Sequence, residues 1–269
     1  MQPADAAAKA PRAGSVQVRL TGLSVDYPTK QGTLRAVENV DLTIRAGEFV
    51  AVLGPSGCGK STLLRVLAGL LAPSTGEAEI AGTRVAGPRR DVGVVFQDPT
   101  LLPWKTVFEN LCLPGRIMGL DRAAYTARGR ALLKLVGLEA FADYLPHQLS
   151  GGMRQRVGIA RGLLHDPAVL LMDEPFGALD AMTREAMNLE IQRIWAATKK
   201  SILFITHSIP EAVFLADRIA VMSARPGRVV EIVDNDLPRP RSIEIMSTPV
   251  FSERTARLRR FFRVEGGVD

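Results

Sequence analysis

Apolar and polar residues alternate in two stretches near the start of the chain. Residues 16–20 and residues 40–44 both carry apolar side chains at every second position, with polar residues between them. A period of two places alternate side chains on opposite faces of an extended chain, so one face can enter a core while the other meets water. Both stretches are therefore predicted to be half-buried antiparallel strands.

Four shorter stretches are apolar throughout. They are residues 49–53, 92–96, 169–172 and 202–205, and helical patterns lie between them. A continuous apolar run of this length is typical of a strand buried on both faces, as in a parallel sheet covered by helices. The alternation of such strands with helices predicts an α/β core with a mainly parallel sheet.

The part of the chain from about residue 99 to residue 161 has a different pattern. Three stretches in it are predicted to be helical, namely residues 106–118, 122–136 and 153–164. Pro114 and Gly115 should break or kink the first of these helices. Because no convincing strand interrupts this part, it is predicted to be a helical subdomain inserted into the α/β core. Further on, residues 219–223 and 229–233 flank Arg225-Pro226-Gly227, which predicts a hairpin.

Composition adds limits on the class of protein. The 269 residues are 46% hydrophobic and 23% charged, as in an ordinary globular domain. No apolar run approaches the ~20 residues that span a bilayer. Residues 1–15 lack the apolar core of a signal peptide and are predicted to be a disordered tail. We therefore expect a cytoplasmic chain that does not cross a membrane by itself.

Charge and cysteine content change this picture little. Two cysteines, Cys58 and Cys112, are too few for a disulfide framework and are expected to be reduced thiols. The net charge is +6, and much of the surplus lies in residues 239–269, where arginines alternate with Leu258 and Phe261. This tail is predicted to be a basic amphipathic helix. A solvated helix face explains its charge more simply than a lipid or partner contact does.

A glycine-rich loop follows the first buried strand. Residues 54–62 read Gly-Pro-Ser-Gly-Cys-Gly-Lys-Ser-Thr, which matches the phosphate-binding P-loop pattern between a strand and a helix. The glycines let backbone N–H groups curl around phosphate oxygens, and the helix dipole adds to the attraction. Lys60 would bind the β- and γ-phosphates, and Ser61 would ligate Mg²⁺. The whole loop is thus predicted to bind ATP: Gly54, Pro55, Ser56, Gly57, Cys58, Gly59, Lys60, Ser61 and Thr62. A bulky reagent on Cys58 is expected to inhibit.

Two acidic residues end a second buried strand. Asp173 and Glu174 follow the apolar run 169–172. Ligands collect at the carboxyl ends of parallel strands, so Asp173 is predicted to hold Mg²⁺. Glu174 would polarise the attacking water.

Residues 149–156, Leu-Ser-Gly-Gly-Met-Arg-Gln-Arg, decide among the kinds of P-loop protein. Ser150 can cap the helix that follows and leave its first N–H groups free for a phosphate. Placed just before the strand that carries Asp173, this segment closely resembles the signature motif of ABC transporter ATPases. The resemblance extends over residues 16–233, with the motifs in the family's order. It implies an α/β P-loop NTPase core with an antiparallel β-subdomain and an inserted α-helical subdomain, together forming a nucleotide-binding domain over residues 16–238.

The same resemblance implies roles for further residues. Tyr27 would stack on adenine. Gln97 matches the glutamine that joins the core to the helical subdomain, senses the γ-phosphate and shares the metal. Ser150, Gly151 and Gly152 would contact the γ-phosphate bound to a second copy of the chain. Asp180 matches the loop at the dimer interface, and His207 matches the switch histidine, so Glu174, His207 and Lys60 form the expected catalytic set.

Met153 and Gly177 differ from the family's usual glutamine and serine, at positions to which no phosphate or metal contact was assigned.

The partners expected from this resemblance are a second ATPase subunit, integral membrane permease subunits and, indirectly, an extracytoplasmic solute-binding protein. Residues 98–104 and 208–212 resemble the nitrate/sulfonate/taurine importer branch. ABC exporters and lipid-trafficking systems stay open as alternatives. Soluble ABC ATPases that act on DNA or ribosomes fit less well, because this chain has one P-loop, one signature and no heptad run. No nucleic-acid partner is expected.

Overall fold

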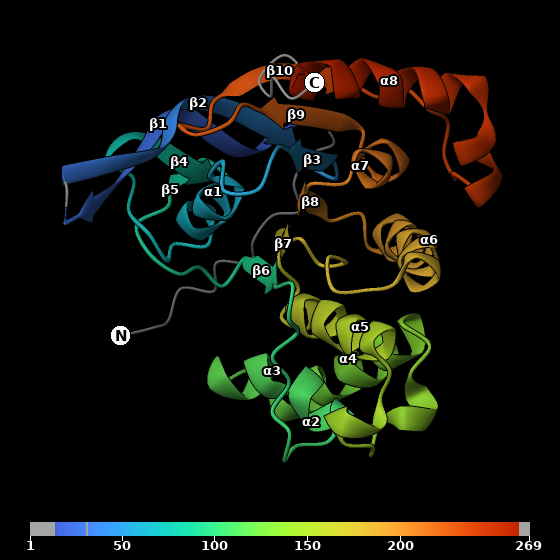
Figure 1. Cartoon of the computed structure of the whole chain (residues 1–269). Coiled ribbons are helices and arrows are strands. Elements are labelled where there is room, and N and C mark those ends of the chain that lie inside the picture. Colours follow the sequence, from blue (N-terminus) through green and yellow to red (C-terminus); the bar gives the residue numbers. More distant parts are fainter. Residues whose placement is uncertain (1–13, 31, 264–269) are drawn as a thin grey trace.

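The computed structural model describes residues 14–30 and 32–263. The predicted disordered tail, residues 1–15, therefore lies almost entirely outside the described residues. Two sheets form the body of the molecule, and a group of helices extends from it at the end opposite α8 (Figure 1). The predicted fold class is confirmed. The predicted domain boundaries remain a prediction.

The larger sheet has six strands in the order β10-β9-β3-β8-β7-β6. Their bounds are β3 Phe49–Leu53, β6 Val92–Val95, β7 Val169–Asp173, β8 Ser201–Thr206, β9 Arg218–Met222 and β10 Val229–Asp234. Strands β3, β6, β7, β8 and β9 run parallel, and β10 pairs antiparallel with β9. All four apolar runs and the predicted hairpin thus form strands of this sheet.

The smaller sheet is antiparallel, with four strands in the order β2-β1-β4-β5. They are β1 Val16–Thr29, β2 Gly32–Arg45, β4 Thr75–Ile80 and β5 Thr83–Arg84. The two alternating stretches of the sequence pair with each other, with Val18 opposite Ile44 and Leu20 opposite Leu42. Strand β4 was not predicted, because Ala78 and Ile80 are its only buried residues and leave too short a pattern.

Strand β3 separates two hydrophobic cores. Phe49, Ala51 and Leu53 face the core that includes residues of α6 and α7, while Val50 and Val52 face the core beneath α1 and the smaller sheet. The helices around the larger sheet are α1 Lys60–Leu67, α6 Ala181–Thr198, α7 Ile209–Leu215 and α8 Pro249–Arg263. Because β3 is buried on both faces, the loop that leaves its carboxyl end starts from a rigid position.

The helical subdomain contains four α-helices, at the lower end of Figure 1. They are α2 Val107–Leu111, α3 Leu113–Ile117, α4 Arg122–Leu135 and α5 Gly151–Leu163, with short 3₁₀ turns at Glu139–Phe141 and Pro146–Gln148. The chain breaks between α2 and α3 at Cys112, two residues before Pro114, as the sequence predicted. Thr106 and Glu109 form a capping box that starts α2.

The C-terminal part of the described chain lies back over the larger sheet (Figure 1). A 3₁₀ turn at Ile243–Ser247 leads into α8, which buries Phe251 and Leu258. On its outer side Arg257 pairs with Glu231 of β10. This arrangement fits the expected solvated face. Within the described residues, no helix combines the length and apolar character needed to cross a bilayer.

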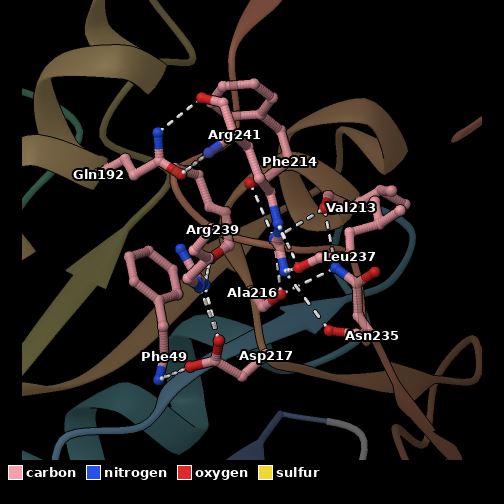
Figure 2. A network of polar contacts seen from close by, with 11 residues as sticks. Phe49, Gln192, Val213, Phe214, Ala216, Asp217, Asn235, Leu237, Arg239 and Arg241 are labelled. Carbon is pink, nitrogen blue, oxygen red and sulfur yellow. Dashed lines mark hydrogen bonds and ion pairs between the residues drawn. The ribbon is translucent and has the colours of Figure 1, made fainter. Parts of the chain in front are cut away.

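Arg241 lies in the segment between β10 and α8, residues 235–248, which we call the arm (Figure 2). Its side chain is among the largest that are fully buried, and its Nη1 donates to the carbonyl oxygens of Val213, Phe214 and Ala216 at 3.0, 2.9 and 2.9 Å. The backbone of Arg241 exchanges two hydrogen bonds with the Gln192 side chain of α6, both 2.7 Å. Burial lowers the pKa of Arg241 to about 10. The arm is thus bound to the end of α7 and to α6.

Candidate nucleotide site

The glycine-rich loop leaves β3 and curls into α1, which begins at Lys60. Gly59 has φ 104°, and a Cβ there would lie 2.6 Å from Val37 Cγ2 and 2.8 Å from the Ala36 carbonyl oxygen. Only glycine fits this position. The side chain of Lys60 is 4% exposed and donates from Nζ to the carbonyl oxygens of Gly54 and Pro55, each at 2.9 Å. The ammonium group is thus held inside the loop where phosphates would bind.

Ser61 of α1 contacts Asp173 at the end of β7. Ser61 Oγ donates to Asp173 Oδ1 at 2.9 Å. Burial raises the pKa of Asp173, and the hydrogen bond from Ser61 opposes that shift. A hydroxyl and a carboxylate at this distance, beside a phosphate loop, are the protein ligands that Mg²⁺ uses with nucleotide phosphates. The chemistry of these two side chains fits that ion.

Glu174 follows Asp173 with a left-handed backbone, φ 43°. For a non-glycine residue this conformation is strained and is often found at functional sites. Its N–H donates to the Ile205 carbonyl oxygen at 3.0 Å, which fixes it against β8. The carboxylate lies between two other predicted catalytic residues: Oε1 is 3.6 Å from Lys60 Nζ, and Oε2 is 2.9 Å from His207 Nδ1. The structure therefore brings Lys60, Glu174 and His207 together.

Tyr27 lines the same pocket as Lys60 and Glu174. Its hydroxyl lies 3.3 Å from Thr62 Oγ1, and the ring belongs to β1 close to the β1–β2 hairpin. The pocket has a volume of about 220 Å³. It is lined by Tyr27, Leu34, Ala36, Ser56, Gly57, Gly59, Lys60, Ser61, Thr62, Glu174 and Arg225. Cys58 does not line this pocket, although Gly57 and Gly59 on either side of it do, because the Cys58 side chain is buried.

The predicted signature residues lie elsewhere on the chain. Gly151 lines a second pocket of about 440 Å³ with Gln97 and Leu179. Ser150 caps α5 by accepting a hydrogen bond from the Met153 N–H at 3.3 Å. Gln97, predicted to share the metal, thus faces this second pocket rather than the one that contains Ser61.

Two more predicted residues stand at the start of helices. Gly152 packs closely against α6, since a Cβ there would lie 2.8 Å from Thr183 Cγ2. Asp180 caps α6 by accepting from the Thr183 N–H at 3.0 Å. The residues predicted to bind nucleotide therefore fall into two separate groups on one chain, one around Lys60 and one around Gly151.

The fold and the contacts around the phosphate loop agree with the result of a comparison with known protein families. The family of ABC transporter domains matches residues 37–177. The chain belongs to the ATP-binding proteins of ABC transporters. An ABC ATPase hydrolyses ATP. The residues predicted for that reaction lie close together in this chain, with Ser61 bonded to Asp173 and Lys60 paired with Glu174.

Similar ABC proteins cover most of the chain. An uncharacterized ABC transporter ATP-binding protein of Methanocaldococcus jannaschii is 47% identical over 86% of this chain and 88% of its own length. The taurine import ATP-binding protein TauB of Burkholderia pseudomallei is 51% identical over 77% of this chain and 80% of its own length.

Solved ABC structures share the fold. The dimeric post-hydrolysis state of the ATP-binding cassette MJ0796, bound to ADP and Pi, has a TM-score of 0.71 at 33% identity and covers 82% of this chain and 100% of that one. CbiO1 of Clostridium perfringens, part of the transporter complex cbiONQ, has a TM-score of 0.74 at 28% identity and covers 91% of this chain and 97% of its own.

Sequence reasoning missed several residues at this ABC site. Arg225 lines the pocket of Lys60, although the turn that carries it was predicted only as a hairpin. Glu211 accepts from Thr206 Oγ1 at 2.6 Å and pairs with Arg184 of α6 at 3.5 Å, beside the His207 loop. The only sequence signal for Glu211 was its place in the segment that follows His207.

Proposed function

We propose that this chain is the ATP-hydrolysing subunit of an ABC importer that powers the uptake of a small solute through a separate membrane permease. An anion such as nitrate, a sulfonate or taurine is the proposed class of solute. The observation that carries this proposal is the 51% identity to a taurine import ATP-binding protein over 208 residues. The proposed location is the cytoplasmic face of the cell membrane, where the subunit is bound peripherally.

Two copies of the chain form the working unit. The support for this step is the separation of the two half-sites, with Lys60 and Glu174 in one pocket and Gly151 in the other. In a head-to-tail pair, the loop at Lys60 of one copy faces Ser150, Gly151 and Gly152 of its partner. The helix capped by Ser150 then directs its N-terminal N–H groups at the γ-phosphate.

The chemistry follows from the contacts around Glu174. Ser61 and Asp173 would hold Mg²⁺, which would supply positive charge to neutralise the phosphates of bound ATP. Lys60, already desolvated inside the loop, binds the phosphates. Glu174 accepts a hydrogen bond from the attacking water and orients it for in-line attack. His207, 2.9 Å from the Glu174 carboxylate, fixes the orientation of that side chain.

The permease contact is proposed to lie on the segment that follows Gln97. Trp104, in the stretch that leads from the core into the helical subdomain, is 72% exposed, and Ile117, at the end of α3 within that subdomain, is 76% exposed. These side chains offer apolar surface to a partner on the segment that Gln97 joins to the core. A change at Gln97 when nucleotide binds would reach the permease through this segment.

A pull-down tests the proposal. Tagged Glu174→Gln protein is incubated with ATP and gently solubilised native membranes, and retained proteins are identified by mass. We expect an integral membrane protein in a one-to-one ratio with the ATPase. Trp104→Ala should lose this protein and keep ATP-dependent dimerisation. Recovery of ribosomal proteins or DNA without a membrane partner would contradict the proposal. Ligand screening of the associated solute-binding protein then tests the anion class.

A further inference from the structure

The turn between β9 and β10 is packed directly on the phosphate loop. The N–H of Gly227 donates to the Ala36 carbonyl oxygen at 3.0 Å, and its carbonyl oxygen accepts from the Glu38 N–H at 2.9 Å. A Cβ at Gly227 would lie 1.9 Å from the Cys58 carbonyl oxygen, so backbone meets backbone there. These contacts fix the turn relative to both β2 and the phosphate loop.

Arg225 extends from this turn along the rim of the nucleotide pocket. Its Nε and Nη2 both donate to the Gly57 carbonyl oxygen, at 3.1 and 2.9 Å. Arg225 lines the same pocket as Lys60 and Tyr27, and it is exposed to solvent. The two hydrogen bonds hold the guanidinium in a fixed orientation at the entrance to this pocket.

These hydrogen bonds leave the charge of Arg225 available. A carbonyl oxygen is neutral, so it orients the guanidinium without neutralising it. The group also has N–H donors beyond the two used at Gly57. The neighbouring Arg228 differs, because it donates to the carboxylate of Glu38. Of the two arginines in this turn, Arg225 is the one that presents a preoriented positive charge to the pocket.

We propose that Arg225 is a further nucleotide-binding residue, which contacts the polyphosphate chain of ATP and holds the phosphate loop through Gly57. Arginine suits this role, because its planar fork binds a carbonyl and a phosphate oxygen at once. The proposal rests on the assignment of the nucleotide site around Lys60. The turn of β9–β10 thereby becomes part of the site, although it lies far along the chain from the phosphate loop.

Equilibrium binding of ATP tests this role. The dissociation constant is measured by calorimetry for the wild-type chain, Arg225→Ala, Arg225→Lys and the control Arg228→Ala. We expect Arg225→Ala to bind ATP about 10-fold more weakly, the effect of one lost charge-assisted hydrogen bond. Arg225→Lys should recover part of the affinity, and Arg228→Ala should bind as the wild type does. The affinity of Arg225→Ala should also depend less on salt, because one phosphate contact is lost.

Steady-state kinetics separates binding from a purely structural role. For Arg225→Ala we expect a raised KM for ATP and a kcat within about 2-fold of wild type, since the charge binds ground state and transition state alike. Equal ATP affinities for Arg225→Ala and Arg228→Ala would overturn the proposal. The proposal would also be overturned if the ATP affinity of Arg225→Ala kept the salt dependence of the wild type and Arg225→Lys recovered none of the lost affinity. Lys60→Ala distinguishes a failure of the Arg225 proposal from a failure of the site assignment. If Lys60→Ala also binds ATP normally, the assignment of the nucleotide site around Lys60 is wrong.

Discussion

His207 Nδ1 lies 2.9 Å from Glu174 Oε2, while the second oxygen of that carboxylate lies 3.6 Å from Lys60 Nζ. One carboxylate is thus held between an imidazole and an ammonium group. Lys60, His207 and Glu174 follow the carboxyl ends of β3, β8 and β7, three neighbouring parallel strands of the larger sheet. A carboxylate with both oxygens directed in this way is oriented before any substrate arrives, which favours its action on a water molecule.

The Glu174→Gln variant should hydrolyse ATP at least about 100-fold more slowly, because a general base contributes about that much to a rate. The amide keeps the shape of the side chain and can still contact His207, so ATP binding and ATP-dependent dimerisation should persist. Phosphate release and size-exclusion chromatography with ATP measure the two properties.

Glu253→Gln serves as the control, because Glu253 is exposed on α8, away from the pocket. It should hydrolyse ATP at the wild-type rate. Rapid hydrolysis by Glu174→Gln would show that another group activates the water.

Cys58 should react slowly with thiol reagents in the folded chain. Its side chain is 1% exposed, and its Sγ would lie 2.9 Å from a Cβ built on Gly54. Burial also raises the pKa of the Cys58 thiol, so little reactive thiolate forms near neutral pH. The position of Cys58 in the loop alone predicts inhibition by bulky reagents. The structure restricts that reaction to molecules that open transiently.

Thiol titration before and after addition of denaturant tests this expectation. Cys112 is also buried, with a thiol pKa raised to about 11, so both thiols should appear only on unfolding. A Cys58→Ser variant identifies the contribution of Cys112. Immediate labelling of Cys58 in the native chain, with loss of ATP binding, would restore the original expectation.

Much of the fold was accessible from sequence because its signals are local. The alternation in residues 16–20 and the apolar run 49–53 each depend on neighbouring residues. The contact of Arg225 with Gly57 joins residues 168 positions apart, and no local pattern predicts it. The same limit applies to Gln97, whose motif identified it without showing that it faces a different pocket from Ser61.

Arg184 and Glu211 should be energetically coupled. Glu211 is 6% exposed, accepts from Thr206 Oγ1 at 2.6 Å and pairs with Arg184 Nε at 3.5 Å. Arg184 also donates to the Leu179 carbonyl oxygen at 2.9 Å, just before the loop at Asp180. The pair thus links that loop to the strand end that precedes His207.

A double-mutant cycle with Arg184→Ala and Glu211→Gln measures this coupling from denaturant unfolding. We expect an interaction free energy of about 0.5–3 kcal/mol, as for contacting residues in one polar network. The pair Arg193–Glu190 on the surface of α6 is the control and should give about 0–1 kcal/mol. Additive effects in the first cycle would contradict a link between the two loops.

Arg241 should contribute more to stability than the exposed arginines of α8. Replacement by Met removes this donor from the buried carbonyl oxygens of Val213, Phe214 and Ala216. Asn235 Nδ2 still donates to those of Val213 and Ala216, each at 2.8 Å, so the loss falls most on Phe214. An unsatisfied buried polar group costs about 1–3 kcal/mol, while removal of a buried charge recovers part of that cost. For Arg241→Met we therefore expect a loss of about 2–4 kcal/mol in the free energy of unfolding.

Arg257→Met is the matched control, because its partner Glu231 and its own side chain are both largely exposed. For Arg257→Met the loss in the free energy of unfolding should be about 0–1 kcal/mol, as for a surface ion pair. Arg241→Lys separates the effect of charge from that of geometry. An ammonium group cannot reach several carbonyl oxygens as the planar guanidinium does. The free energy of unfolding of Arg241→Lys should therefore be close to that of Arg241→Met. Equal unfolding free energies for Arg241→Met and Arg257→Met would mean that the arm is not held to α7 by this side chain.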